Sequence, residues 1–269
     1  MLIHTPNTRA TIIPDPGYTL FDFDLDGADA RVVAWDADEP TMKQAFREGK
    51  KIHAVNALDI YGPEIAGTDG KQEPIYTRVK RAVHATHYGG TPPALAKKCR
   101  MPLSMARDFQ SRYFSVRPKV HAWMQNTEFE LQRCGGVTNI YGYSINFFQR
   151  GADAYTEALA WRPQSTIARV TEIAMVRLHR SVPNFQLLLQ CHDSLVGQIR
   201  NDRISRTLRE IDTVFSAIVV PYSDPLIIPW GAKFSRTSWG ELAPLKWADW
   251  ITSQQPIDAE REELQTALS

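Results

Sequence analysis

Two apolar runs that lie far apart in the chain each end in a carboxylate. The first run, Tyr18–Arg31, contains Asp24, and the second run, Leu187–Val196, contains His192 and Asp193. A buried carboxylate is costly unless it is paired or bound to a metal ion. On neighbouring strands, Asp24 and Asp193 could together hold two divalent cations, the arrangement used for in-line phosphoryl transfer. Taken singly, each aspartate is explained more simply by a turn at the end of a strand.

A helix expected from Tyr76 to His87 carries the second group of candidate residues. Tyr76, Lys80, His84 and Tyr88 are spaced by four and therefore follow one face of this helix. The face is not expected in a core, because the ammonium group of Lys80 would be unpaired there. A cation for phosphate oxygens beside a flat ring for base stacking is typical of nucleotide binding. The alternative is a solvated helix surface.

A third segment, residues 164–178, repeats small and apolar residues at helical spacing, and most of it is expected to pack in a core. Gln164 at its start is the polar exception. Its amide could touch the edge of a base or a sugar.

The composition is that of an ordinary globular protein. The 269 residues, 43% hydrophobic and 23% charged, suffice for a core and one or two domains. We find no run of 18 apolar residues and no secretory signal, so neither a membrane partner nor export is expected. The net charge of +1 does not by itself indicate a nucleic-acid binder. Three widely spaced cysteines, Cys99, Cys134 and Cys191, fit reduced thiols in a cytoplasm better than a disulfide or zinc framework.

The expected elements predict an α+β fold, in which a helical block is inserted between the strands of a small antiparallel sheet. A strand turning into a helix is expected at 18–35, a hairpin at 137–148, strands at 186–190 and 195–199, and a last strand at 225–233. Helices are expected at 40–49, 52–61, 76–87, 94–98, 103–114, 118–133, 153–180 (one or two helices) and 203–218. Residues 62–74 are expected to form a loop, and residues 258–269 an acidic helix or a frayed end.

The order of these pieces resembles the order of motifs in family A DNA polymerases, the group of bacterial DNA polymerase I and its phage relatives. A strand aspartate, a basic and aromatic helix ending in Tyr88-Gly89, a helix beginning at Gln164 and a His192-Asp193 hairpin follow one another in that order. The similarity covers roughly residues 10–245. Further matching segments are Asp24–Arg31, Glu48–His53, Arg112–Phe114, Pro118–Val120, Leu188–Asp193 and Trp230–Trp239. Each motif alone would be weak, but several in one order argue against coincidence.

The resemblance implies a right-hand polymerase fold, with a palm built on a small antiparallel sheet and with helical fingers. Palm segments are expected at residues 1–38 and 139–252, the fingers at 39–138 and a C-terminal tail at 253–269. We find no counterpart of the family's thumb, exonuclease domain or upstream palm strand before Asp24. The chain is therefore expected to be the C-terminal part of a split or truncated polymerase. A separate N-terminal polymerase subunit carrying the thumb or exonuclease is a candidate partner.

The resemblance also implies catalytic roles. Asp24 and Asp193, with the backbone carbonyl of Leu25, would hold two Mg²⁺ ions, which Mn²⁺ could replace. Lys80 would contact the triphosphate and donate a proton to the leaving group.

The remaining roles concern binding. In the nucleotide site, Lys80 and His84 would lie on the fingers helix, His53 at the phosphates, Tyr88 near the templating base and Asp29 under the sugar. Primer-template DNA would be contacted by Gln164, His192 and Arg31.

The chain departs from the family pattern at several of these positions. The sugar contact is usually a glutamate and is Asp29 here, so exclusion of ribonucleotides could be weaker. The carboxylate that usually follows the His-Asp pair is Ser194, which leaves no third acidic ligand. His84 stands where an aromatic is usual. Tyr143 stands in a hairpin that is usually rich in arginine, so the grip on DNA phosphates should be weaker.

The expected function is template-directed DNA synthesis, in which a dNTP is joined to a primer 3′-hydroxyl by a two-metal mechanism in a bacterial cytoplasm or a phage-infected cell. One alternative is a non-catalytic nucleic-acid-binding remnant of the fold, which has no need to keep Asp24, Asp193 and Lys80 together. Another is a different two-metal enzyme, such as a nuclease or phosphatase, which leaves the helix face from Lys80 to Tyr88 unexplained.

Overall fold

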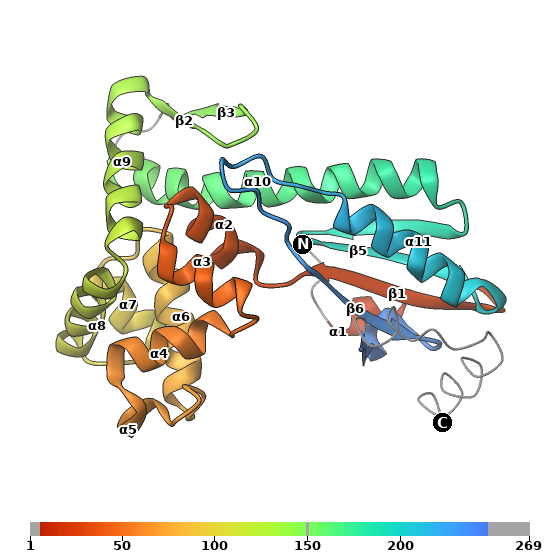
Figure 1. The fold of residues 1–269 in the computed structure, drawn as a ribbon, viewed down its shortest axis with the longest axis horizontal. Coiled ribbons are helices and arrows are strands. Elements are labelled where there is room, and N and C mark those ends of the chain that lie inside the picture. The colour runs from red at the N-terminus through yellow and green to blue at the C-terminus, as the bar shows by residue number, and fades with distance from the viewer. Residues whose placement is uncertain (1–5, 149–150, 247–269) are drawn as a thin grey trace. The chain divides into compact units, whose positions relative to one another are not determined.

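The computed structural model describes residues 6–148 and 151–246, and the chain divides into two compact units (Figure 1). Among the described residues, the sheet unit contains residues 6–26, 168–219 and 227–246. The helical unit contains residues 27–167 and 220–226. These divisions differ from the palm and fingers boundaries predicted above, which stay a prediction.

The sheet unit is built on a sheet that, in the described residues, has five strands in the order β4-β5-β1-β6-β7. The strands are β1 (Tyr18–Leu25), β4 (Phe185–Cys191), β5 (Ser194–Arg200), β6 (Trp230–Ser235) and β7 (Ala243–Leu245). All neighbouring strands are antiparallel. The predicted α+β class and the predicted strand hairpin ending in His192-Asp193 are confirmed.

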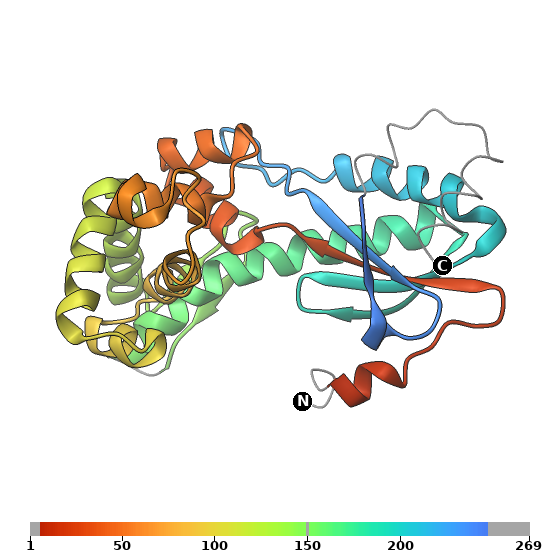
Figure 2. The same ribbon diagram turned by 90° about the horizontal axis from the view of Figure 1, so that it is seen from below.

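Helices cover both sides of this sheet. They are α1 (Pro6–Ala10), the part of α10 (Ala152–Ser181) that follows residue 167, α11 (Ile204–Ser216) and the 3₁₀ turns η1 (Asn201–Arg203) and η2 (Trp239–Glu241). Figure 2 shows α11 and α1 on opposite sides of the sheet.

One face of β1 is aromatic, because side chains alternate between the two faces of a strand. Phe21 and Phe23 stack at 5.9 Å between ring centroids. Phe23 meets Phe215 of α11 edge to face at 5.6 Å, and Phe215 stacks on Trp230 at 4.1 Å. These rings join α11 to the middle of the sheet.

The other face of β1 carries Leu20, Asp22 and Asp24. Leu20 packs with Val196 and Trp239 in a buried cluster. Asp22 is only 6% exposed, and the indole nitrogen of Trp239 donates a hydrogen bond of 2.7 Å to its Oδ2. A polar side chain inside the sheet is therefore held by a residue 217 positions away in the sequence.

The helical unit contains a series of short helices. They are α2 (Ala28–Asp36), α3 (Pro40–Arg47), α4 (Ile52–Tyr61), α5 (Pro63–Ala66), α6 (Ile75–His87), α7 (Pro92–Cys99), α8 (Leu103–Val116), α9 (Pro118–Cys134) and the first part of α10. The hairpin of β2 (Gly136–Thr138) and β3 (Ser144–Asn146) follows α9. Four of these helices begin with proline in the first turn, where its missing N–H has no partner to lose.

The structure corrects several details of the predicted elements. The predicted loop 62–74 contains α5, and the region 153–180 is one helix although Pro163 lies inside it. The predicted last strand 225–233 begins only at Trp230, since Pro225 and Pro229 have no N–H for a strand ladder. The strand β7 was not predicted. The predicted tail helix 258–269 lies outside the described residues.

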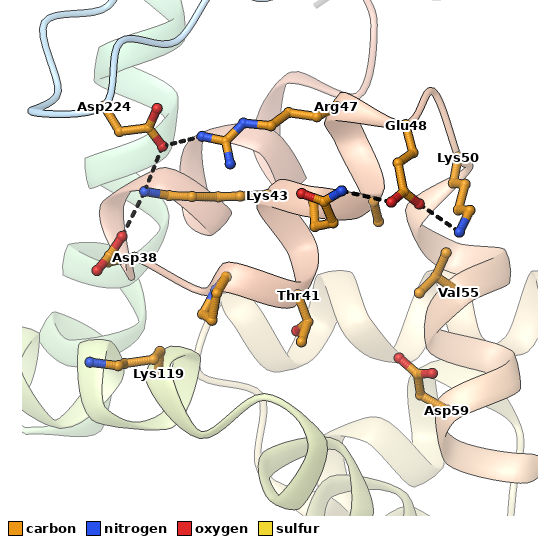
Figure 3. A pocket seen from close by; sticks show the side chains of 13 residues that line it. Asp38, Thr41, Lys43, Arg47, Glu48, Lys50, Val55, Asp59, Lys119 and Asp224 are labelled. Carbon is orange, nitrogen blue, oxygen red and sulfur yellow. Dashed lines mark hydrogen bonds and ion pairs between the residues drawn. The ribbon is translucent and has the colours of Figure 1, made fainter.

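An ion-pair cluster anchors the segment 220–226 within the helical unit (Figure 3). Asp224 Oδ2 lies 2.6 Å from Arg47 and 3.1 Å from the ammonium nitrogen of Lys43, which lies 2.6 Å from Asp38 Oδ1. Lys43 is nearly buried, so pairing with carboxylates is needed to offset its desolvation. The cluster borders a cavity of about 800 Å³ that none of the expected site residues lines.

Among the helices of residues 6–148 and 151–246, none combines the length and the apolar character that crossing a membrane requires.

The bond between Trp239 and Asp22 predicts a specific loss of stability. Trp239→Phe leaves the buried carboxylate of Asp22 without this donor, whereas Trp230→Phe removes an indole nitrogen that makes no hydrogen bond. Both changes remove similar apolar area. We expect Trp239→Phe to lower the free energy of unfolding by about 1–3 kcal/mol more than Trp230→Phe does. Urea unfolding followed by far-UV circular dichroism measures the difference, and equal losses would contradict the assignment.

Candidate active site

The two predicted aspartates lie at the same end of neighbouring strands in the sheet unit. Asp24 of β1 is the register partner of Ser194 of β5. The backbone N–H of Leu25 donates a hydrogen bond of 3.2 Å to the carbonyl of Asp193. Asp193 belongs to the two-residue tip between β4 and β5, and His192 beside it has a left-handed φ of 56°. The juxtaposition inferred from the sequence is present, and the roles of these residues stay a prediction.

Burial and neighbouring carboxylates both raise the pKa of Asp24. Burial is the largest cause of its raised pKa, and the charges of Asp193, Asp22 and Asp26 raise it further. Lys233 opposes them, with its ammonium nitrogen 3.8 Å from Asp24 Oδ2. Carboxylates held this close repel one another, and a bound cation would relieve the repulsion.

The donor set at this strand end fits Mg²⁺ bound jointly with a phosphate. Mg²⁺ is commonly held by one or two carboxylates and completes its shell with water and substrate phosphate oxygens. Asp24 and Asp193 supply two carboxylates. Ser194 supplies no third carboxylate, and its hydroxyl donates a hydrogen bond of 3.1 Å to the carbonyl of Cys191. Within the described residues, no three His, Cys, Asp or Glu side chains lie together as a metal site of their own.

The helix α6 of the helical unit presents the predicted polar face. Lys80 and His84 are exposed, while Tyr76 and Tyr88 are half-buried. The adjoining row of Val79, Val83 and His87 is buried. The amphipathic spacing of the helix therefore directs Lys80 and His84 to solvent, as the sequence indicated.

The expected sugar contact lies beside this face. Asp29 stands in the first turn of α2, and its Oδ1 accepts a hydrogen bond of 2.7 Å from the hydroxyl of Tyr88. The rings of Tyr88 and His84 meet edge to face, with centroids 4.5 Å apart. Arg31 lies with its guanidinium 4.4 Å from the ring centroid of Phe46. The structure thus brings Asp29, Tyr88 and His84 together.

The histidines near α6 have lowered pKa values. Burial, followed by the charges of Lys80 and His84, lowers the pKa of His53 to about 4. Partial desolvation of the His84 ring also lowers its pKa, against the opposing charge of Asp29. At neutral pH His53 is therefore a neutral imidazole.

Sequence reasoning missed the buried pair of His87 and Tyr113. Nε2 of His87 lies 2.5 Å from the Tyr113 hydroxyl, and both side chains are buried. One signal could have found His87: it follows Val79 and Val83 at intervals of four, and so belongs to the inward row of α6.

The candidate residues fall into two groups, one in each unit. The sheet unit holds Asp24, Leu25, His192 and Asp193, and His192 is exposed. The helical unit holds the other expected site residues, which are Asp29, Arg31, His53, Lys80, His84, Tyr88 and Gln164. Gln164 is exposed on α10 and does not join the cluster of Asp29 and Tyr88.

Comparison with known proteins identifies the class of this chain. The model of DNA polymerase family A matches residues 4–235. The chain belongs to this family.

Its relatives include bacterial and phage enzymes. DNA polymerase I of Chloroflexus aurantiacus is 27% identical over 252 residues, which cover 88% of this chain and 26% of that protein. The DNA polymerase of Mycobacterium phage D29 is 25% identical, over 87% of this chain and 37% of that protein. The thermostable DNA polymerase I of Thermus filiformis is 30% identical, over 72% of this chain and 24% of that protein. The chain thus spans about a quarter to two fifths of the length of these relatives.

A solved structure has the same fold. The polymerase domain of Pol1 from M. smegmatis, in complex with DNA primer-template and dNTP, superposes with a TM-score of 0.77 at 17% identity. The match covers 87% of this chain and 42% of that chain. The predicted membership of family A and the predicted polymerase-domain fold are confirmed.

The raised pKa of Asp24 predicts that its ionised carboxylate lowers the stability of the folded chain at neutral pH. The folded pKa of Asp24 exceeds the unfolded pKa, so its ionised form opposes folding at neutral pH and its protonated form does not. In EDTA, Asp24→Asn should therefore have a higher Tm than the parent protein at pH 7. The difference should shrink as the pH falls through the raised pKa of Asp24. Thermal unfolding between pH 3 and pH 7 measures it, with the exposed Asp202→Asn as a control. A lower Tm for Asp24→Asn at pH 7 would count against the electrostatic account.

Proposed function

We propose that the polymerase to which this chain belongs carries out template-directed DNA synthesis, with the chemistry centred on Asp24 and Asp193. The single observation that carries the proposal is the placement of these two aspartates at one end of adjacent strands in a family A chain. The chain covers only part of its relatives, so the activity belongs to the complete polymerase, and synthesis by this chain alone is expected to be weak or absent.

The proposed reaction joins a dNTP to a primer. The 3′-oxygen of the primer forms a bond to the α-phosphorus as the bond from that phosphorus to the leaving pyrophosphate breaks. Asp24, Asp193 and the carbonyl of Leu25 would hold two Mg²⁺ ions, with Mn²⁺ as a substitute. When bound, the ions supply a lowered pKa for the 3′-hydroxyl and neutralisation of the triphosphate charge. Lys80, exposed on α6, donates a proton to the pyrophosphate oxygen as it leaves.

The helical unit provides the nucleotide contacts in this proposal. Lys80 meets the phosphates as a cation, and His53 meets them as a hydrogen-bond donor that is neutral before the nucleotide binds. His84 packs against Tyr88, which lies near the templating base. Asp29, held by the hydroxyl of Tyr88, lies under the sugar and disfavours a 2′-hydroxyl.

DNA and further protein partners complete the proposal. Gln164, His192 and Arg31 contact the primer-template. The Pol1 polymerase domain, solved in complex with DNA primer-template and dNTP, supports these two ligands. A separate N-terminal subunit carrying a thumb or exonuclease is proposed as a partner. The bacterial and phage relatives support a bacterial cytoplasm or a phage-infected cell as the location.

Primer extension tests the catalytic assignment. With Mg²⁺, labelled dNTPs and the product of the upstream reading frame, we expect extension that Asp193→Ala reduces at least about 1,000-fold, since a metal-binding carboxylate is lost. The exposed Asp202→Ala in the same unit should retain extension. Extension that survives Asp193→Ala would refute the metal assignment. No incorporation by the parent chain, with or without the upstream product, would favour a non-catalytic binding remnant.

Ribonucleotide incorporation tests the sugar contact. Asp29→Ala removes the group that Tyr88 holds, and we expect the preference for dNTP over rNTP to fall about 10- to 100-fold. The matched control is Asp69→Ala, which changes an exposed carboxylate that pairs with Lys71. Steady-state kcat/KM values for one dNTP and the corresponding rNTP give the ratio. An unchanged ratio would remove Asp29 from the nucleotide site.

A further inference from the structure

The C-terminal end of α6 is closed by a tight backbone turn. The N–H of Gly89 donates to the carbonyl of Thr86 at 3.0 Å, and the N–H of Gly90 donates to the carbonyl of Ala85 at 2.9 Å. Gly89 has a φ of +73°, which completes a Schellman end of the helix. Tyr88 is the residue just before this turn, so the turn determines where its side chain starts.

A side chain of α8 binds the same turn from outside the helix. The amide nitrogen of Gln110 donates to the carbonyl of Gly90 at 2.6 Å and to the hydroxyl oxygen of Thr86 at 3.3 Å. Gln110 thereby connects a residue inside α6 to a residue beyond its end. A rotation of this helix end would break both bonds.

A second contact from α8 holds the residue directly before Tyr88. The His87 ring and the Tyr113 hydroxyl form the bond of 2.5 Å described above. Burial lowers the pKa of His87 to about 3 and raises the pKa of Tyr113, so both groups are neutral around pH 7. Tyr113 is itself fixed by stacking on Phe109, with centroids 6.1 Å apart. The imidazole therefore has a neutral, rigidly placed partner.

Tyr88 lies directly after His87 and directly before the turn that Gln110 binds. Its side chain has only two rotatable bonds, so the position of its hydroxyl follows the backbone of the helix end. That hydroxyl donates the bond of 2.7 Å to Asp29. Neither Gln110 nor the pair of His87 and Tyr113 takes part in this bond.

We propose that Gln110 and the His87–Tyr113 pair are positioning residues that hold Tyr88 against Asp29 and so set the discrimination between deoxyribonucleotides and ribonucleotides. The inference rests on the proposed role of Asp29 as the sugar contact. A role in packing alone would lower the stability of the variants and leave their sugar discrimination unchanged.

Two conservative variants test the proposal. Tyr113→Phe removes one oxygen and keeps the ring, and Gln110→Met keeps the volume and removes both donors. Each should lower the ratio of kcat/KM for dATP to kcat/KM for ATP by about three- to tenfold, a change of the size that the net contribution of a typical hydrogen bond gives. The matched control Tyr18→Phe removes a hydroxyl that accepts a bond of 3.3 Å from Gln186 in the sheet unit, and should leave the ratio unchanged.

A double variant tests whether the pair acts through its shared hydrogen bond. His87→Leu with Tyr113→Phe should lower the ratio no further than Tyr113→Phe alone, because both changes remove one interaction. If the chain incorporates no nucleotide without its upstream partner, equilibrium binding of dATP and of ATP gives the same comparison.

The outcomes separate this inference from the proposed function. A changed ratio in Asp29→Ala, with an unchanged ratio in folded Tyr113→Phe and Gln110→Met, overturns the inference alone. An unchanged ratio in Asp29→Ala overturns the proposed sugar contact and the inference with it. If Tyr113→Phe does not fold, Gln110→Met decides, since its side chain is only half-buried.

Discussion

The antiparallel pairing of β1 with β5 on one side and β6 on the other is the interaction on which the rest of the structure depends. It brings residues near the start of the chain into one ladder with residues 170 to 215 positions later. The period of two along β1 places phenylalanines on one face and carboxylates on the other. The register then sets Asp24 opposite Ser194 and thereby beside Asp193. A slip of one residue would turn the carboxylates toward α11 and the aromatic core.

The two units differ in the charge of their candidate site residues. The sheet unit gathers Asp24, Asp26 and Asp193 at one strand end, with Asp22 further inside the sheet, and burial and the charges of these neighbours raise the pKa of Asp24. Only Asp22 among them is buried, and the indole of Trp239 binds it. The helical unit gathers Lys80 with histidines that burial keeps neutral. One group of residues therefore attracts cations, and the other offers donors to an anion.

Much of the fold and part of the site could be predicted from local patterns. Alternation identified β1, and proline and glycine positions identified the helix ends. What escaped prediction depends on distant partners. The bond from Trp239 to Asp22 joins residues 217 positions apart, and the pair of His87 and Tyr113 joins two helices. The neutral state of His53 follows from burial, which no motif encodes. Strand β7 has three residues and contains Pro244, so it carries too little pattern to be recognised.

Because segment 220–226 belongs to the helical unit, recombination within this gene is constrained. The chain passes between the units after residues 26, 167, 219 and 226, so each unit is encoded by separate stretches of sequence. A single recombination event inside the gene therefore cannot replace one unit as a whole. A transplanted helical unit would also need the short second stretch that carries Asp224, or else Lys43 would lose one of the two carboxylates that offset its burial. Recombination between the genes of relatives should therefore favour breakpoints that leave residues 27–167 and residues 220–226 from the same parent gene.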